Sequence, residues 1–535
     1  MKHFIFRNTT IEPLFKSKDV EFSGYDDISS INTEADIFFW FYLLPYQHDS
    51  EVLASQIEFF YQNIEMVYNR IPETKFFCVF TLVNPFGSPI KTGDFSVRNA
   101  INDFNQKIVK FSETRGNVKI VDIADFILNN RSIELIDWKY YFISKMLINP
   151  RLAKSFSLWF QSQIDAIMSK RKKCLVLDLD NTLWGGILGE DGISGIKIGG
   201  DYPGNCFAEF HKSIIELKNS GIILTVCSKN NEADVLEAWD KNPNIIIQKS
   251  DISSYRINWN NKAQNIREIA EELNIGLDSM VFIDDNPTER ELVRQVLPGV
   301  TTPDFPAHPY DFPNFIGKVV SEYFQTYNVT EEDLNKTKQY KSNSERVDFK
   351  KSFDNFDQYL KSLKIKILIE KASKFSIPRI AQMTQKTNQF NLTTYRYSEG
   401  DIREFVNNNN HWVYSMAVED KFGDNGITGL TIIEIDKKNN TAQIDALLLS
   451  CRILGKSIEV AFVCYILNKL KESGIKEVYA KYLATAKNSQ VKDFYEKIGL
   501  TCTNEKKTDS HEKEYSIVLE DFPYKKNDIY NITEE

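Results

Sequence analysis

Short apolar runs alternate with amphipathic stretches over the first third of the chain, a pattern typical of α/β proteins. The strand-like runs are residues 37–44, 76–82 and 118–123, and the stretches with helical spacing are residues 51–68 and 96–114. We therefore predict an α/β domain over residues 1–170. A predicted helix over residues 152–169 leads into the basic segment 170–173, which we interpret as a solvated linker.

Farther along, apolar runs end in side chains that suit phosphate chemistry. Residues 174–177 are followed by Asp178 and Asp180, and then by Thr182. Because strand side chains alternate, both carboxylates can face the crevice beyond the strand, where ligands bind in open α/β sheets. One would attack phosphorus and the other would handle the proton, with Mg²⁺ neutralising the phosphate oxygens. Alone, so short a motif also fits two solvated or helix-capping acids in a surface turn.

Three later segments strengthen the phosphoryl-transfer interpretation. The run 222–227 leads into Ser228, Lys229 and Asn230, whose hydroxyl and ammonium groups suit a transferring phosphoryl group. Lys262 precedes a helical pattern at 263–273, and the run 280–283 ends in a second pair of acids. That pair is Asp284 and Asp285.

This series resembles the haloacid dehalogenase (HAD) superfamily. Its four motifs match Asp178, Asp180 and Thr182, then Ser228, then Lys262, and then Asp284 and Asp285. The resemblance implies that Asp178 becomes an aspartyl-phosphate and that Asp180 acts as general acid and then as base. It also implies that Lys262 orients the reacting groups and neutralises their negative charge. Mg²⁺ would be held by Asp178, the Asp180 backbone carbonyl and either Asp284 or Asp285.

The spacing of these motifs leaves little room for a cap domain. Between Asp180 and Ser228 there is space for a Gly-rich flap at 184–192 and one helix near 208–220. We therefore expect an uncapped site that is open to solvent. Such a site favours a large or protein-tethered substrate, or a partner domain that serves as the lid.

Length and composition predict a multidomain protein that is located inside the cell. The chain has 535 residues, 42% of them hydrophobic, which is ample for several cores. A net charge of −9 with scattered Lys and Arg gives little support to nucleic-acid binding. Seven cysteines without framework spacing suit a reducing compartment, and the most apolar run, 35–46, is too short for a membrane span. We predict a soluble cytoplasmic protein with neither a nucleic-acid nor a membrane partner.

Residues 1–170 resemble the SGNH-hydrolase-like region of longer HAD relatives. Where such a hydrolase carries its nucleophilic serine, this chain reads Phe6-Arg7-Asn8-Thr9-Thr10, and near the expected Asp-x-x-His it reads Asp137-Trp-Lys-Tyr140. Both the nucleophile and the base are missing. We therefore expect a binding or docking role rather than catalysis.

The C-terminal part alternates strand-like and helical patterns again. The expected strands are 364–369, 413–418, 428–435, 442–449 and 477–483; helices are expected over 377–390, from about 457 to 473, and from 488, with a turn by 500. The segment 450–457 leads into the long helix and would place Arg and Gly at a helix N-terminus, which suits an anion. This region resembles GNAT-type acyltransferases, in which Arg452, Gly455 and Ser457 would hold a pantetheine phosphate of coenzyme A or of an acyl carrier protein.

The whole of residues 172–519 resembles the FkbH-like subfamily of HAD proteins, which joins an uncapped HAD domain to a GNAT-like half. The resemblance is carried by residues 177–186, 227–230, 282–287, 379–394 and 449–455. It implies a multidomain α/β protein in four parts: an SGNH-like domain (1–170), a HAD Rossmann-like parallel sheet (171–325), a helical linker (326–362) and a GNAT-like domain (363–535). It also implies that the glyceryl unit of 1,3-bisphosphoglycerate is dephosphorylated and loaded as a thioester on an acyl carrier protein, for polyketide or surface-glycan synthesis.

Thioester formation requires a thiolate at the acyl-phosphate carbonyl, so a cysteine relay is one possible route. Cys451, beside Arg452 at a predicted helix N-terminus, ranks first and Cys227 second. Both also fit small buried hydrophobes, and direct attack by the carrier's thiol needs neither. Lys386, Asn388, Gln389 and Asn391 could hold glycerate hydroxyls or pantetheine amides, or could simply end a helix.

Two other function classes stay open. The protein could be a plain Mg²⁺ phosphatase whose C-terminal half binds substrate. It could also be a GNAT-type acyltransferase or a scaffold for a biosynthetic complex.

Overall fold

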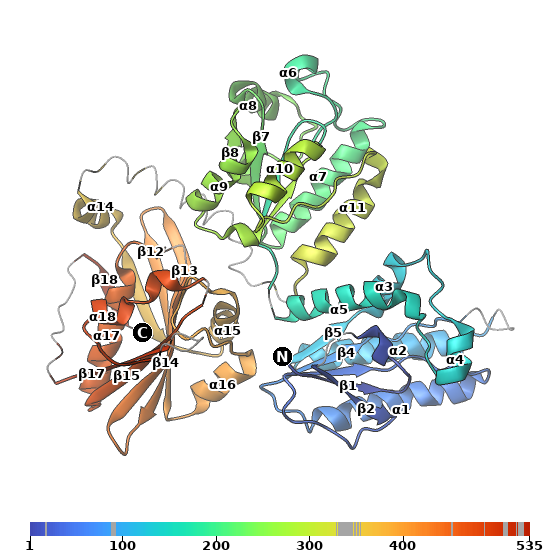
Figure 1. The fold of residues 1–535 in the computed structure, drawn as a ribbon, viewed down its shortest axis with the longest axis horizontal. Helices are drawn as coiled ribbons and strands as arrows, with labels where there is room; N and C mark the ends of the chain where they lie inside the picture. Colours follow the sequence, from blue (N-terminus) through green and yellow to red (C-terminus); the bar gives the residue numbers. More distant parts are fainter. Residues whose placement is uncertain are drawn as a thin grey trace. The chain divides into compact units, whose positions relative to one another are not determined.

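The computed structural model arranges the chain as three β-sheets with their covering helices (Figure 1). The chain divides into two compact units, Met1–Met168 with Tyr397–Glu404, and Ser169–Arg396 with Phe405–Glu535. The structure describes residues 1–15, 19–86, 93–168, 170–327, 329, 346, 349, 353, 355–450, 453–485, 487–506, 512–520, 522 and 529–534. None of the helices in this described part is both long and apolar enough to span a bilayer.

The N-terminal sheet is parallel, with the strand order β2-β1-β3-β4-β5. Its strands are β1 (His3–Arg7), β2 (Val20–Tyr25), β3 (Ile37–Phe41), β4 (Phe76–Phe80) and β5 (Val118–Val121). Its helices are α1 (Ser50–Tyr68), α2 (Ser96–Glu113), α3 (Ile123–Asn129), α4 (Trp138–Ser144) and α5 (Ala153–Ile167).

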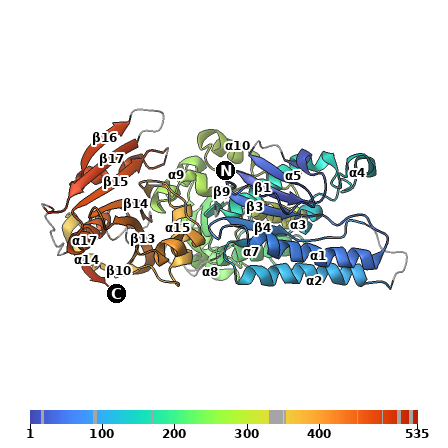
Figure 2. The same ribbon diagram turned by 90° about the horizontal axis from the view of Figure 1, so that it is seen from below.

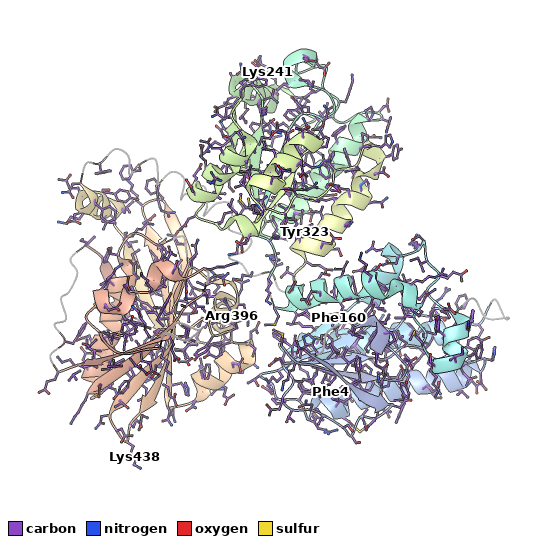
Figure 3. All side chains as sticks on the ribbon, viewed as in Figure 1. Phe4, Phe160, Lys241, Tyr323, Arg396 and Lys438 are labelled. Atoms are coloured by element: carbon purple, nitrogen blue, oxygen red, sulfur yellow. The ribbon has the colours of Figure 1, made fainter. Side chains whose placement is uncertain are left out.

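Every residue of β3 is buried because helices cover both faces of this sheet. Phe38 and Trp40 pack into a core with side chains of α1 and α2, which lie side by side (Figure 2). Phe39 points to the opposite face, where its ring centroid lies 4.8 Å from that of Phe160 on α5. Phe4 belongs to the α1 side, so Phe4 and Phe160 mark the two faces of the sheet (Figure 3). The continuous apolar run of β3 is therefore that of a central parallel strand.

The second sheet is also parallel, with the order β8-β7-β6-β9. Its strands are β6 (Cys174–Leu177), β7 (Ile223–Ser228), β8 (Ile252–Ile257) and β9 (Met280–Ile283). Its helices are α6 (Leu188–Asp191), α7 (Gly204–Asn219), α8 (Glu232–Lys241), α9 (Lys262–Glu272), α10 (Pro287–Val296) and α11 (Phe312–Val319), followed by a π-helical turn (Val320–Phe324). Leu175 and Leu177 pack toward α7, α8 and α11, whereas Cys174 and Val176 pack toward α9 and α10.

Asparagines begin three helices at the carboxyl edge of this sheet. The side chains of Asn231, Asn261 and Asn286 accept backbone N–H groups in the first turns of α8, α9 and α10. Capping of this kind stabilises a helix by about 1 kcal/mol. It also fixes where each helix starts relative to the strand or loop before it, which positions the side chains of the candidate site.

The C-terminal sheet has nine strands among the described residues, and most of its pairings are antiparallel. Its strands are β10 (Lys366–Lys371), β11 (Phe390–Asn391), β12 (His411–Asp420), β13 (Gly423–Asp436), β14 (Thr441–Leu449), β15 (Glu477–Leu483), β16 (Thr501–Lys506), β17 (Glu512–Val518) and β18 (Asn531–Glu534). Its helices are α14 (Phe356–Leu363), α15 (Ile377–Lys386), α17 (Ile458–Glu472) and α18 (Phe494–Lys497). Between α15 and β12 in the sequence lies α16 (Glu399–Asn407), most of which belongs to the first unit. Most of the expected linker 326–362 falls outside the described residues; α14 covers its end.

Two expectations for the C-terminal elements are wrong. The helix expected over residues 377–390 ends at Lys386, and β11 begins at Phe390, because Thr387 turns to an extended conformation and Phe390 pairs with β14. The helix expected from residue 488 is reduced to a 3₁₀ turn (Ser489–Val491) and the four-residue α18.

Candidate functional site

The predicted catalytic residues meet at the carboxyl edge of the second sheet. Leu177, the last residue of β6, lies between Val226 of β7 and Ile283 of β9 in the parallel register. Asp178 and Asp284 follow directly, and the Asp178 N–H donates to the carbonyl of Ile283 at 3.0 Å. The alternation of strands and loops thus brings together groups that are about 100 residues apart in sequence.

Lys262 is buried between two carboxylates. Its Nζ lies 3.0 Å from Asp178 Oδ1 and 2.6 Å from Asp284 Oδ2, and only 3% of the residue is exposed. Burial alone would lower the pKa of the ammonium, but the two carboxylates outweigh burial and raise the pKa above its usual value. Lys262 is therefore a fixed positive charge beside the expected nucleophile.

Asp178, Asp284 and Asp285 form a group that fits a metal ion, since one carboxylate oxygen from each lies within 4.8 Å of the others. Burial and the charge of Asp178 raise the pKa of Asp284 to about 6, although Lys262 opposes the shift. Burial and Asp178 also raise the pKa of Asp285. Three crowded, partly desolvated carboxylates are the oxygen ligands that Mg²⁺ prefers.

Within this group, Asp285 has the more available carboxylate. Asp284 Oδ2 accepts from Lys262 and its Oδ1 accepts from the Asn286 N–H at 2.8 Å. Asp285 is instead fixed by its backbone: its N–H donates to Thr182 Oγ1 at 3.1 Å, and its carbonyl accepts from Arg290 at 2.6 Å. The geometry favours Asp178 and Asp285 as carboxylate ligands, with Asp284 orienting Lys262.

The carboxylate of Asp180 points away from this group. Its Oδ1 accepts from Trp184 Nε1 at 2.8 Å and from the Leu188 N–H at 3.1 Å, and its Oδ2 accepts from Asn230 Nδ2 at 2.9 Å. Among the predicted metal residues, Asp180 is thus left with only its backbone carbonyl as a ligand, as the family resemblance implies. Its side chain is free of the metal cluster and can serve in proton transfer.

The other residues of the second and first motifs take supporting positions. Asn230, expected to bind substrate, donates to Asp180 and weakly to Ser228 Oγ at 3.4 Å. Lys229 forms an ion pair with Glu289 at 2.6 Å. Thr182 is fully buried and holds the Asp285 backbone, so its hydroxyl is part of the scaffold of the site.

Three residues outside the predicted set also shape the site. Trp184 contacts Asp180, and Arg290 binds the backbone carbonyls of Asp284 and Asp285. His211 is fully buried on α7; its Nε2 donates to the Leu183 carbonyl at 2.8 Å and its Nδ1 accepts from the Ile247 N–H at 3.3 Å. Nothing in the local sequence pattern points to any of these three contacts.

Residues 170–327, all described, contain no cap domain. Only α6 and α7 lie between β6 and β7, and only α8, a 3₁₀ turn (Lys249–Asp251) and β8 lie between β7 and α9. The site is therefore bounded by the flap around α6 and by loops of its own domain.

The C-terminal candidates lie apart from this site. Cys451 and Arg452 fall outside the described residues. Gly455 and Ser457 both have positive φ, +76° and +59°, in the turn that begins α17. Lys386, Asn388 and Gln389 line a cavity of about 240 Å³ together with Lys173 and Ser279. Those last two residues stand before β6 and β9, at the strand ends opposite Asp178.

Asn391 is fully buried and its side chain is used within the fold. Its Nδ2 donates to the Thr387 carbonyl at 3.3 Å, and its Oδ1 accepts from the Thr394 N–H at 2.9 Å. These bonds favour the alternative of a helix terminus over direct substrate binding for Asn391.

Cys227 is likewise buried, with its Sγ 3.7 Å from the Lys262 carbonyl. Burial raises the pKa of this thiol to about 12, although the Lys262 charge opposes the shift. A thiol that stays protonated and has no access to solvent is a poor relay nucleophile. This environment argues against Cys227 as a relay.

The predicted hydrolase positions of the N-terminal domain serve the fold. Thr9 and Thr10 donate hydrogen bonds to the carbonyls of Lys145 and Ser144. Asp137 caps α4 by accepting from the N–H groups of Lys139 and Tyr140. These contacts use all three side chains within the N-terminal domain.

Comparisons with known proteins bear on the second sheet. The family of NLI interacting factor-like phosphatases matches residues 173–311. The crystal structure of the N-terminal part of protein BF1531 from Bacteroides fragilis, containing a phosphatase domain complexed with Mg, is 28% identical over 62% of this chain and 94% of that chain, with a TM-score of 0.53. A search of the curated proteins found no match.

Acetyltransferases are also among the similar structures. The ribosomal-protein-S18-alanine N-acetyltransferase of Escherichia coli is 11% identical over 29% of this chain and 94% of that chain, with a TM-score of 0.23. Spermidine N-acetyltransferase of Vibrio cholerae in complex with CoA and spermine is 13% identical over 29% of this chain and 98% of that chain, with a TM-score of 0.24.

The mixed α/β multidomain architecture expected from the sequence is confirmed. The stretch that matches the phosphatase family also carries the carboxylate group and Lys262. This part of the chain is therefore similar to phosphatase domains of the HAD type, and its carboxylate group suits Mg²⁺.

Proposed function

We propose that the protein is a Mg²⁺-dependent phosphatase and glyceryl transferase of the HAD type that acts on an acyl carrier protein. The observation that carries the phosphatase half is the contact of Lys262 with both Asp178 and Asp284, beside the free carboxylate of Asp285. The transferase half rests on the sequence resemblance to FkbH-like proteins and on an uncapped site, which can admit a substrate tethered to a carrier.

The residues divide the chemistry between them. Asp178 attacks phosphorus, the bond from phosphorus to the leaving oxygen breaks, and Asp180 gives that oxygen a proton. Asp180 then takes a proton from water, whose oxygen attacks phosphorus and releases Asp178. Bound Mg²⁺ would lower the charge of the phosphate oxygens and bring the phosphate to Asp178. Lys262 compensates the negative charge at Asp178 and forms an ion pair with Asp284.

Loading the carrier requires different bonds. The carrier's thiolate would attack the acyl-phosphate carbonyl of 1,3-bisphosphoglycerate, forming a carbon–sulfur bond as the carbon–oxygen bond to phosphate breaks. Asp178 would remove the remaining phosphate monoester. The burial of Cys227 leaves direct attack by the carrier, or a relay through Cys451, as the routes to test.

One observation favours the second candidate, a plain phosphatase. β14 and β15 pair only through Thr441–Ile444 and Glu477–Ala480, and beyond that point both strands bond to the chain's own segment 390–393. The Leu392 N–H donates to the Leu447 carbonyl at 3.2 Å and its carbonyl accepts from the Leu483 N–H at 2.8 Å. An extended pantetheine arm cannot bond to these backbone groups while the segment is in place.

Intact-mass spectrometry of the carrier separates the candidates. The protein, a holo-acyl carrier protein, Mg²⁺ and freshly generated 1,3-bisphosphoglycerate would be incubated with wild type, Asp178→Asn and, as a control, Asp240→Asn on the exposed side of α8. A dephosphorylated glyceryl adduct that is lost or left phosphorylated only in Asp178→Asn supports the transferase. Phosphate release without an adduct leaves a phosphatase, and neither product refutes both candidates.

A further inference from the structure

The carboxylate of Asp180, in the turn after β6, accepts hydrogen bonds from three donors. Trp184 Nε1 and the Leu188 N–H donate to Oδ1 at 2.8 and 3.1 Å, and Asn230 donates to Oδ2 at 2.9 Å. The first two belong to the flap, and the third follows β7. Both oxygens are therefore fixed, and with them both rotatable bonds of the side chain.

Trp184 is the donor that best suits a positioning role. The residue is 0% exposed and packs in the core with Phe207 and Leu188, so the indole cannot turn its N–H to water. An indole has a single donor and no acceptor, and a buried one needs a partner. Asp180 supplies that partner. A rigid ring thus restrains the Asp180 carboxylate together with the Leu188 N–H and Asn230.

The same bonds tie the flap to the reacting residues. Leu188 begins α6, and Gly185 exchanges backbone hydrogen bonds with Lys197 at 2.7 and 3.0 Å. The Gly186 N–H donates to Asn181 Oδ1 at 2.9 Å. The flap is thereby fastened to the turn after β6 through Asn181, and to Lys197 through Gly185.

We propose that Trp184, together with Asn230, is a positioning residue that holds the Asp180 carboxylate for proton transfer. This inference rests on the proposed phosphatase chemistry. A general acid acts only when it lies within hydrogen-bond distance of the leaving oxygen, and small misplacements lower the rate strongly. Releasing one donor lets the carboxylate rotate without touching Asp178, Lys262 or the metal ligands.

Leaving-group dependence tests the proposal directly. A leaving group of low pKa departs without a proton, whereas one of high pKa needs the acid, so the positioning of Asp180 matters only for the second. Steady-state and single-turnover rates would be measured with phenyl, 4-nitrophenyl and 2,4-dinitrophenyl phosphate for wild type, Trp184→Phe and Asp180→Ala. For Trp184→Phe we expect the rate of enzyme phosphorylation to fall about ten- to a hundredfold with phenyl phosphate and by less than about threefold with 2,4-dinitrophenyl phosphate.

Two comparisons make the result specific. Trp239→Phe is the matched control. Trp239 is also buried in this domain, but its ring packs on Tyr255 and is not among the described contacts of Asp180. Combined with Asp180→Ala, the Trp184→Phe change should have no further effect on the phosphorylation rate. A uniform loss with all three substrates, or an additive loss in the Asp180→Ala background, would mean that Trp184 supports only the fold and would overturn the proposal.

A measurement without turnover separates this proposal from the proposed function. In protein labelled with ¹⁵N-indole tryptophan, the Trp184 N–H signal should shift upfield in Asp180→Ala while that of Trp239 stays in place. An unmoved Trp184 signal overturns the proposal even if the protein is an active phosphatase. If the Trp184 signal shifts in Asp180→Ala but the wild-type protein hydrolyses none of the three phosphates, the positioning contact stands and the proposed phosphatase chemistry is refuted.

Discussion

The ammonium of Lys262 lies 2.6 Å from the Asp284 carboxylate and joins it to Asp178. Asp284 is fully buried, so each charge of this trio depends on the others for solvation. Removing one member of a buried ion cluster leaves an uncompensated charge, which destabilises a protein far more than the loss of a surface pair. The trio therefore couples the stability of the phosphatase domain to its chemistry.

We expect Lys262→Met to lower turnover about 10²- to 10³-fold, because the phosphoryl group loses a fixed positive charge. Without metal, the variant should be destabilised by about 3 kcal/mol, since Asp178 and Asp284 then repel each other. Mg²⁺ should restore part of this loss and raise the melting temperature more than it does in wild type. Lys218→Met, which breaks a 2.6 Å pair with Asp251, is the control. Equal Mg²⁺ effects in both variants would contradict the account.

Asp285→Asn should weaken Mg²⁺ binding at least about tenfold while leaving stability nearly unchanged. Its carboxylate is free of hydrogen bonds to other described side chains, whereas both Asp284 oxygens are engaged. Asp284→Asn should instead lower stability, because Lys262 loses a partner. Isothermal titration with Mg²⁺ and urea unfolding separate the two effects. The reverse order of affinities would make Asp284 the direct ligand.

That Asp178, Lys262 and Asp284 lie together could be predicted from the sequence for a physical reason. Asp178 and Asp284 directly follow short apolar strands, and parallel strands that run side by side bring the residues after them to one edge of the sheet. The contacts of Asp180 with Trp184 and of His211 with Leu183 could not be predicted, because an apolar ring and a lone histidine in amphipathic stretches look like core. β11 was missed because helical spacing continues past Lys386, while the pairing that ends the helix comes from β14, about 60 residues later.

Cys227→Ala should leave phosphate release, and any glyceryl loading, unchanged within about twofold. The thiol is buried, and burial raises its pKa to about 12, so almost no thiolate exists at neutral pH. Removing one sulfur atom from the core should lower stability by only about 1 kcal/mol. The carrier adduct in the mass-spectrometric assay is the readout. An adduct lost from Cys227→Ala, with phosphate release intact, would restore this cysteine as a relay.

His211 predicts an acid-sensitive phosphatase domain. Burial lowers the pKa of its imidazole from 6.5 to about 4, so the folded state resists a proton that the unfolded state accepts below pH 6.5. The contribution of His211 to the free energy of unfolding is therefore fully present above pH 6.5. It is lost as the pH drops toward 4, by roughly 3 kcal/mol in total. Urea unfolding of wild type and His211→Gln over this range tests the slope. A constant difference between the two proteins would contradict it.

Asn488→Ala should free the segment that bridges β14 and β15. The Asn488 side chain is fully buried: its Nδ2 donates to the carbonyls of Asn391 and Leu483 at 2.9 Å, and its Oδ1 accepts from the Thr485 N–H at 2.7 Å. Leaving these groups without partners should destabilise the C-terminal sheet by about 2–4 kcal/mol.

Hydrogen exchange of this variant also bears on how a carrier arm could bind. The amides of Leu392 and Leu483 should lose protection first, because they close the gap between the strands. Asn468→Ala, which removes only an exposed contact with Glu472, should leave both amides protected. If a holo-acyl carrier protein binds Asn488→Ala more tightly than wild type, the segment occupies the path of the pantetheine arm. Equal binding would place the arm elsewhere and make the segment a permanent part of the sheet.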